Sequence, residues 1–333
     1  MSQSIALGGA AAPAAVHEHK PAADPRRRLQ LALGVIWLLD AMLQFQPFMF
    51  GRGFGQMLAA SAHGNPAVVA GPVTWSATFI GHHAAVLNAI FAVIQLLLGL
   101  GIAWRPAVRL ALAASVAWAL AVWWLGEGLG GLLAGAASPV SGAPGAVLLY
   151  ALLAVLLWPA ERHPPDPDGT AQVPAARAVG RRAARACWLA VWLGLAALAL
   201  LPATRAPGAL SGMIAGTTPG EPAWLARIDA HAASALARHG LLAAIVLAAV
   251  LAALAVAIYL PRRLAPAALT AALVVAALLW LAQGLGGILT GSATDPNTGP
   301  LLALLALSFW PTALPTPGPI TGPTAGPAAS GSA

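Results

Sequence analysis

The chain has 333 residues, of which 59% are hydrophobic and only 8% are charged, and its mean hydropathy is +0.79. Soluble domains carry about a quarter charged residues, so this composition excludes an ordinary soluble protein and indicates an integral membrane protein. The net charge of +7 would suit a nucleic-acid-binding protein, but no recognition helix or aromatic-basic interleaving accompanies it, so no nucleic-acid partner is expected.

Both ends of the chain are predicted to be disordered cytoplasmic tails. In residues 1–27 a weakly apolar run precedes the arginine cluster, whereas in a secretory leader the charges come first. Residues 312–333 contain Pro and Gly at a density that excludes a packed helix.

Eight apolar runs between these tails are predicted to be transmembrane helices. A hydrocarbon core about 30 Å thick needs about 20 apolar residues in a helix, and the runs lack the alternation typical of barrel strands. A long outer connection with an interfacial segment near 52–62 follows the first run, and the segment 160–185, rich in Pro, Arg and Asp, is predicted to be a cytoplasmic linker. The predicted spans are 29–46, 83–104, 107–125, 145–159, 186–202, 239–260, 264–282 and 299–311.

The sequence indicates a tandem duplication of one four-helix unit. The stretch WWLGEGLGGLLAGAA (123–137) is nearly repeated as LWLAQGLGGILTGSA (279–293), a shift of 156 residues, and shifts of 155 and 152 align the preceding and following segments. Four crossings are an even number, so both units have the same orientation. The expected fold is an all-α membrane protein of two parallel four-helix repeats, 28–159 and 186–311.

The basic residues are distributed unevenly over the connections. Thirteen fall on one set of loops and tails and four on the other, which is the positive-inside pattern and predicts a plasma-membrane protein with both termini cytoplasmic. The thirteen are Lys20, Arg26, Arg27, Arg28, Arg105, Arg109, Arg162, Arg177, Arg181, Arg182, Arg185, Arg262 and Arg263; the four are Arg52, Arg205, Arg227 and Arg238.

Asp40 is the one carboxylate expected inside a span, where it should face protein or water because burial near mid-bilayer is costly. Trp37, Asp40 and Gln44 share one stripe of the first helix, whereas the matching positions of the second unit are Trp192, Leu195 and Ala199. A structural carboxylate that hydrogen-bonds a neighbouring helix is the alternative to a functional one.

Glu127 lies where the third span ends on the outer side, and its counterpart is Gln283. Glutamine can keep hydrogen bonds but cannot carry a proton or a charge at neutral pH. The shared glycines therefore read as architectural and Glu127 as a function kept in one half, unless Glu127 is simply a solvated carboxylate at a helix end.

Polar residues on three helices of the first unit are predicted to line one outward-facing cavity. His83 and Asn88 at the start of the second span join Asp40, Gln44 and Glu127 at a similar depth, with Trp37 and Trp124 as candidate walls. Asp40, His83 and Glu127 are the candidate catalytic residues. No metal site is assigned, because adjacent histidines such as His82 and His83 point about 100° apart on a helix.

The four-span module, with LLDAMLQFQPFMFGRGF (38–54) and WWLGEGLGG (123–131), resembles the DoxX/DoxD-type family of small bacterial membrane proteins, here doubled, and uncharacterised multi-pass proteins of actinobacteria. The resemblance covers the topology of most of residues 28–311. It implies a link to quinone-dependent oxidation and to membrane oxidoreductase complexes, and it assigns no active-site residue.

Three functions follow as hypotheses. The first is a quinone-linked redox subunit, whose partners would be a quinone and other subunits of a membrane complex. The second is a transporter of a small solute or ion, and the third is a membrane scaffold. No sequence motif identifies a cofactor, because no flavin, haem or phosphate-loop signature is present.

Overall fold

The computed structural model describes residues 24–159 and 173–311, and every regular element within these two ranges is a helix. The first half contains α1, α2, α3, α4, α5 and α6, with short 3₁₀ turns η1 to η4 between them. Their bounds are α1 Pro25–Leu43, η1 Pro47–Phe50, α2 Arg52–Ala60, α3 Ala67–His82, α4 Ala84–Ala103, η2 Arg105–Ala107, α5 Val108–Leu125, η3 Gly128–Gly131, η4 Pro139–Ser141 and α6 Ala146–Leu156.

The second half contains α7 to α14 and the turns η5 and η6. Their bounds are α7 Pro174–Val179, α8 Arg181–Ala199, α9 Pro202–Arg205, α10 Ala209–Ala215, α11 Ala223–Leu236, α12 Gly240–Val256, η5 Ala257–Tyr259, α13 Ala265–Ala282, η6 Gly284–Gly287 and α14 Thr298–Ser308. Residues 1–23, 160–172 and 312–333 lie outside the described residues, and most of the predicted tails and linker fall there.

Five helical segments are long and apolar enough to cross a membrane, which confirms the expected all-helical, multi-pass class at this level. Helix α4 has the surface expected of a membrane-spanning helix: one face exposes a continuous apolar stripe, while Asn88 and Gln95 on another face are buried. The stripe consists of Val86, Ile90, Val93, Leu97 and Leu100. The five segments are Ala84–Ala103, Arg105–Leu125, Arg181–Ala199, Gly240–Tyr259 and Ala265–Ala282.

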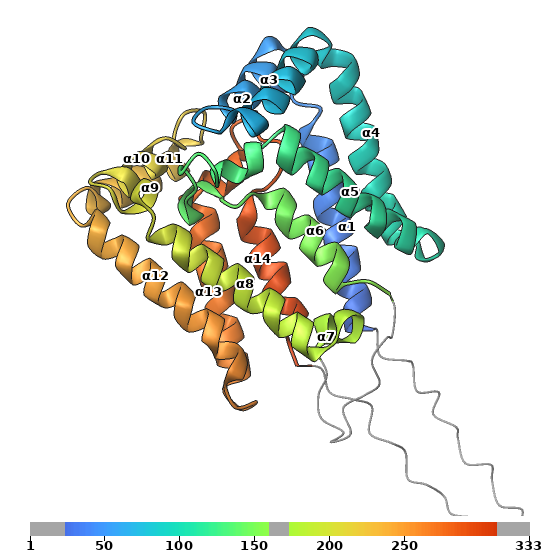
Figure 1. Cartoon of the computed structure of the whole chain (residues 1–333), viewed down its shortest axis with the longest axis vertical. Coiled ribbons are helices and arrows are strands. Elements are labelled where there is room, and N and C mark those ends of the chain that lie inside the picture. The colour runs from blue at the N-terminus through green and yellow to red at the C-terminus, as the bar shows by residue number, and fades with distance from the viewer. Residues whose placement is uncertain (1–23, 160–172, 312–333) are drawn as a thin grey trace, which may run out of the picture.

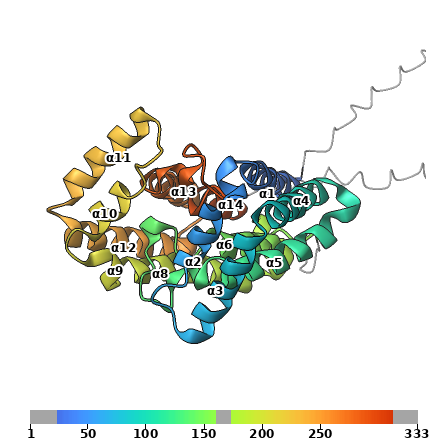
Figure 2. The ribbon, with the colours of Figure 1, turned by 90° about the horizontal axis from the view of Figure 1, so that it is seen from above.

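Helices also occupy the other three predicted spans, but they differ from full-length apolar spans. Helix α1 begins with three arginines, and α6 and α14 have only 11 residues each. Both short helices are the most deeply buried of the molecule. They contact each other and lie between the remaining helices of the two halves (Figures 1 and 2).

The arginine-bearing ends of the helices gather at one end of the molecule. Arg27 Nη1 donates to the carbonyl of Ile102 at 2.8 Å, which joins the start of α1 to the end of α4. Arg177 forms an ion pair with Asp24 at 3.1 Å, which joins α7 to the cap of α1. Helices α2 and α3 cap the first half, and α9 to α11 cap the second, away from α7 and the start of α1 (Figure 1).

Two loops link the halves by reaching across the boundary between them. Pro139, in the loop after η3, accepts a hydrogen bond at 3.0 Å from Gln283 Nε2. In the other direction, Thr294, Asp295 and Asn297 of the loop before α14 enter the wall of a cavity in the first half. Each half is therefore completed by a segment of the other.

The structure corrects the expected boundaries in three places. Residues 67–82, read as part of a long outer connection, form α3, which the interruption by Pro66 and Pro72 had concealed. Residues 25–27, placed in the first tail, begin α1, where Asp24 caps the helix. Residues 174–179 and 181–185, placed in the linker, belong to α7 and α8, because arginine is a good helix former.

Glycines allow α1 and α4 to pack closely. A Cβ at Gly99 would lie 2.7 Å from Leu38 Cγ and 2.8 Å from the carbonyl oxygen of Gly34, whereas a Cβ at Gly194 in α8 meets nothing within 4 Å. We expect Gly99→Leu to destabilise the protein by about 1–3 kcal/mol, measured as a lower thermal midpoint in detergent. Gly194→Leu is the matched control, and equal melting of the two variants would contradict this packing.

Candidate functional site

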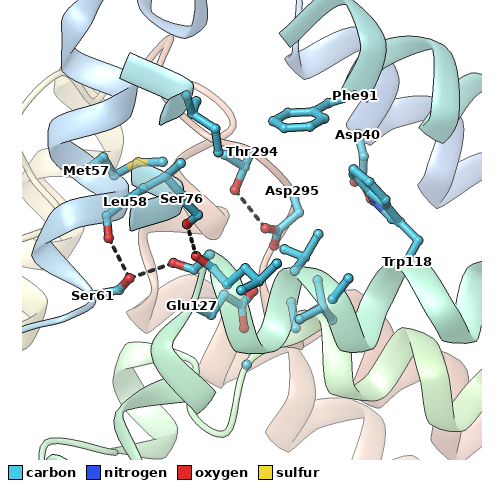
Figure 3. Close-up of a pocket in the computed structure, with 18 of the residues that line it drawn as sticks. Asp40, Met57, Leu58, Ser61, Ser76, Phe91, Trp118, Glu127, Thr294 and Asp295 are labelled. Atoms are coloured by element: carbon cyan, nitrogen blue, oxygen red, sulfur yellow. Dashed lines mark hydrogen bonds between the residues drawn. The ribbon is translucent and has the colours of Figure 1, made fainter. Parts of the chain in front are cut away.

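A cavity of about 610 Å³ lies within the first half, between α1, α2, α3, α4 and α5 (Figure 3). Its walls are largely aromatic and aliphatic. Trp75 and Phe79 of α3 stack at 5.7 Å and border the cavity while 65% and 46% exposed, so the mouth lies beside α3. The aromatic side chains that line it are Trp37, Phe54, Trp75, Phe79, Phe91 and Trp118.

Asp40 reaches this cavity from α1 and is held by a tyrosine. Tyr150 Oη of α6 donates to Asp40 Oδ2 at 2.5 Å, and the Tyr150 ring lies 4.2 Å from that of Trp37. Trp37 is fixed in turn, because its Nε1 donates to Ser115 Oγ at 3.0 Å. Asp40 Oδ1 is buried and has no hydrogen-bond partner among the described residues.

Glu127 reaches the cavity from the turn that ends α5. Two hydroxyls fix the end of that helix by donating to its last carbonyls: Ser76 Oγ donates to Leu125 O at 2.5 Å and Ser61 Oγ to Gly126 O at 2.6 Å (Figure 3). The Glu127 carboxylate lies against the first turn of α6, where the backbone amide of Val147 donates to it. Its Oε2 atom is buried without a hydrogen-bond partner.

Asp295 comes from the second half, in the loop that crosses to the first. Its Oδ1 accepts from the backbone amide of Asn297 at 2.7 Å and its Oδ2 from Thr294 Oγ1 at 2.9 Å. Asn297 then caps α14 by accepting from the amide of Thr298 at 2.7 Å. The helix cap therefore orients Asp295 into the cavity (Figure 3).

Three carboxyl groups thus meet in one cavity whose lining contains no lysine, arginine or histidine. Burial, and then the charge of Asp295, raise the pKa of Glu127 well above its usual range, although the Val147 amide lowers it in part. Burial also raises the pKa of Asp295, against the opposing hydrogen bonds from Asn297 and Thr294. Burial in the cavity consequently favours the protonated forms of Glu127 and Asp295.

The expected site residues fall into two groups. Trp37, Asp40, Gln44 and Glu127 line the cavity together, as grouped by the sequence. Asn88 is fully buried beside it, where Nδ2 donates to the backbone carbonyl of Gln44 at 2.6 Å, so it fixes the end of α1 without bordering the cavity.

His83 and Trp124 do not join the site. His83 is exposed and packs against Phe79 with ring centroids 5.0 Å apart, because α3 ends there and turns into α4 outside the cavity. Trp124 is 47% exposed and points away from the cavity. The residues of the same helix that line the cavity there are Ala121, Val122 and Leu125. Among the residues that the structure describes, no group of three or more His, Cys, Asp or Glu side chains is arranged to hold a metal ion.

Sequence reasoning missed Tyr150, Asp295 and the contribution of α3. The turn signal Asp-Pro-Asn-Thr before an apolar run does identify a helix cap at 295–298, but nothing in the sequence indicates that this cap faces the other half. Tyr150 lies in a uniformly apolar run, where a single hydroxyl gives no pattern.

The raised pKa of Glu127 makes stability depend on pH. In the unfolded chain the Glu127 carboxyl loses its proton above about pH 4, whereas in the folded protein it keeps the proton to higher pH. The stability that this group contributes is therefore fully present below about pH 4 and is lost as pH rises through the folded-state pKa. We expect Glu127→Gln to raise the thermal midpoint at pH 8 and to have no such effect near pH 4, measured by thermal unfolding in detergent.

The reciprocal variant Gln283→Glu serves as the control. Gln283 Nε2 donates to Pro139 O at 3.0 Å and to Thr298 Oγ1 at 2.8 Å, so a carboxylate there would face a carbonyl oxygen and should lower the midpoint at pH 8. A stabilisation by Glu127→Gln that is the same at both pH values would show that the carboxyl charge is not its cause.

Comparison of the chain with protein-family models, curated proteins and solved structures gave no match. The site is therefore described from its own geometry.

Proposed function

We propose that the cavity binds a lipophilic cation and releases protons as it does so, the exchange that a membrane transporter of the cation-proton type would use. The observation that carries this proposal is that two buried carboxyl oxygens in the cavity have no hydrogen-bond donor among the described residues. Asp40 Oδ1 and Glu127 Oε2 are buried, lack hydrogen-bond partners and belong to a cavity with no basic residue in its lining. A buried carboxylate without a partner is costly, so the complementary ligand donates hydrogen bonds and carries positive charge.

The aromatic walls support the same class of ligand. Trp75, Phe91 and Trp118 line the cavity, and a cation over the face of an aromatic ring gains about 0.5–2 kcal/mol. The remaining walls are apolar and suit a hydrophobic body attached to the charged group. The mouth beside α3 gives such a molecule a route along exposed apolar side chains.

The charge balance of binding follows from the raised pKa values. Without ligand, Glu127 and Asp295 hold protons because burial disfavours their charged forms. A bound ammonium group would favour the carboxylates instead, so one or more protons leave as one positive charge enters. Affinity should therefore increase with pH across the titration of these groups.

We also propose that the two halves are parallel repeats and that only the first keeps the acidic site. In the sequence alignment Asp40 pairs with Leu195, Glu127 with Gln283, and Asp295 with Ala143. Leu195, Gln283 and Ala143 are all buried, at 3%, 4% and 5% exposure. Support comes also from η3 and η6, which share the sequence GLGG and the same turn.

The proposed location is the plasma membrane, with the arginine-rich end cytoplasmic and the cavity on the outer side. Support comes from the contacts that bring Arg27 to Ile102 and Arg177 to Asp24 at one end of the molecule. Helix α3, which borders the cavity, lies toward the opposite end (Figure 1).

A quinone-linked redox role, which the DoxX-like resemblance implies, is the second candidate. One observation favours it: protonated Glu127 and Asp295 could donate hydrogen bonds to a quinone carbonyl and supply protons as a partner subunit delivers two electrons. An oxidised quinone offers only acceptors, however, and does not satisfy the oxygens of Asp40 and Glu127 in their charged form.

Binding of a hydrophobic ammonium tests the first candidate. Titration of purified protein with 4-phenylbutylammonium, followed by calorimetry in a weakly buffered detergent solution, is expected to show saturable binding with proton release. Affinity should rise between pH 5 and pH 8, and Glu127→Gln should weaken it about tenfold or more through loss of a charge-assisted hydrogen bond.

Two controls make this result specific. Glu221→Gln removes a carboxyl that does not line the cavity and should leave affinity unchanged. The neutral isostere 4-phenylbutanol should bind without proton release. Equal binding of both ligands, or an equal loss in both variants, would rule out carboxylate recognition of a cation.

Quinone turnover separates the second candidate from the first. If the chain serves quinone chemistry, membranes that contain it should reduce a short-chain quinone analogue, and Glu127→Gln should abolish the added rate. Turnover that is unchanged in this variant removes Glu127 from such a reaction, and ammonium binding without any turnover leaves the first candidate alone.

A further inference from the structure

A second cavity, of about 370 Å³, lies at the arginine-rich end, between α7, α8, α13 and the segment after α12. It belongs to the second half and shares no residue with the acidic site. We propose that this arginine groove binds an anionic phospholipid, with the phosphate among its arginines and an acyl chain along its floor. The arginines of the groove are Arg177, Arg181, Arg185 and Arg262.

The charged side chains that line the groove are all basic. Its lining contains four arginines and no aspartate or glutamate, although the chain as a whole has ten acidic residues. Arg177 contacts Asp24 at 3.1 Å, and that carboxylate is 40% exposed at the edge of the groove. Arg185 lies with its guanidinium 5.4 Å from the Tyr259 ring centre, which fixes its position by a cation–π contact.

The floor of the groove is apolar and its side chains have no unused hydrogen-bond donor. Trp188 packs on Phe309 with ring centroids 4.9 Å apart, and its only donor, Nε1, is already bonded to Leu254 O at 2.9 Å. Ala184 and Leu269 complete this surface. A free phosphate ion gains nothing from such a floor, whereas a hydrocarbon chain does, so a phosphate that carries acyl chains fits the whole groove.

The groove also lies at the level of a lipid headgroup. It is lined by the start of Arg181–Ala199, the end of Gly240–Tyr259 and the start of Ala265–Ala282, three segments long and apolar enough to span a membrane, and by Arg262 between the last two. Tyr259 and Leu260 beside it are 60% and 44% exposed, as expected of residues at an interface. Basic pockets between helices on the cytoplasmic side are suited to anionic headgroups.

The test compares two double variants with the same loss of charge. Arg181→Gln with Arg262→Gln removes two arginines of the groove, whereas Arg182→Gln with Arg263→Gln removes their neighbours, which do not line it. Purified protein is titrated with phosphatidylglycerol or phosphatidylcholine in mixed micelles, and bound lipid is counted by native mass spectrometry. Thermal stabilisation by each lipid is measured in parallel.

We expect the unmodified protein and the Arg182/Arg263 variant to prefer phosphatidylglycerol and to be stabilised by it. The Arg181/Arg262 variant should lose about thirtyfold in apparent affinity, since each arginine near an anionic surface contributes about a factor of five. An equal loss in both double variants would mean diffuse surface attraction. Inorganic phosphate that displaces the lipid at equal concentration would indicate a free-anion site. Both results would overturn the proposal.

The chain's own segment 160–172 is the rival occupant, because it carries Glu161, Asp166 and Asp168 and joins the groove at Val173. The triple variant Glu161→Gln, Asp166→Asn, Asp168→Asn tests whether this segment occupies the groove, because it removes the three acidic charges of the segment. If the full chain retains no phosphatidylglycerol and this triple variant does, the groove belongs to that segment and the lipid proposal fails. Equal retention by both supports the lipid.

Discussion

The architecture depends on a chain reversal that only glycine-rich sequence can make. After α5 the residues Gly128, Leu129, Gly130 and Gly131 all have positive φ, between 56° and 71°, and the turn after α13 repeats this with Gly284 to Gly287. A Cβ at Gly130 would collide with the carbonyl of Pro144, and one at Gly286 with Pro296. Glycine removes both the backbone strain and the collision, although Leu129 and Leu285 still adopt the left-handed conformation. This turn lets α6 and α14 start beside the ends of α5 and α13, and both short helices occupy the centre.

The same reversal explains why Glu127 and Gln283 share a place in the fold. Each follows α5 or α13 directly and lies at the start of the next short helix, where Glu127 accepts from the amide of Val147 and Gln283 exchanges hydrogen bonds with Thr298. Glu127 accepts from a backbone amide of α6, whereas Gln283 bonds the side-chain hydroxyl of Thr298 in α14. The difference is charge: Glu127 shares its cavity with Asp40 and Asp295, whereas Gln283 hydrogen-bonds to Pro139 and Thr298.

Much of the helical layout could be predicted from the sequence, because long apolar runs separated by Gly, Pro and Arg have one stable form in a bilayer. The grouping of Asp40, Gln44 and Glu127 was also predictable, since helical spacing and depth are local properties. Helix α3 was not, because Pro72 and its uneven polarity hide it. Asp295 was not, because its position depends on how one loop crosses to the other half. His83 was misplaced for a related reason: without α3, nothing indicated that the turn before α4 lies outside the cavity.

Asp295 comes almost at the end of the described chain and yet completes a wall formed by residues 37–147. All five long apolar segments precede Asp295 in the chain, so during synthesis they are complete while this wall is still missing. Until the loop before α14 arrives, Asp40 and Glu127 border an unfinished cavity. The order of the residues along the chain therefore means that this cavity is complete only when synthesis has passed residue 295.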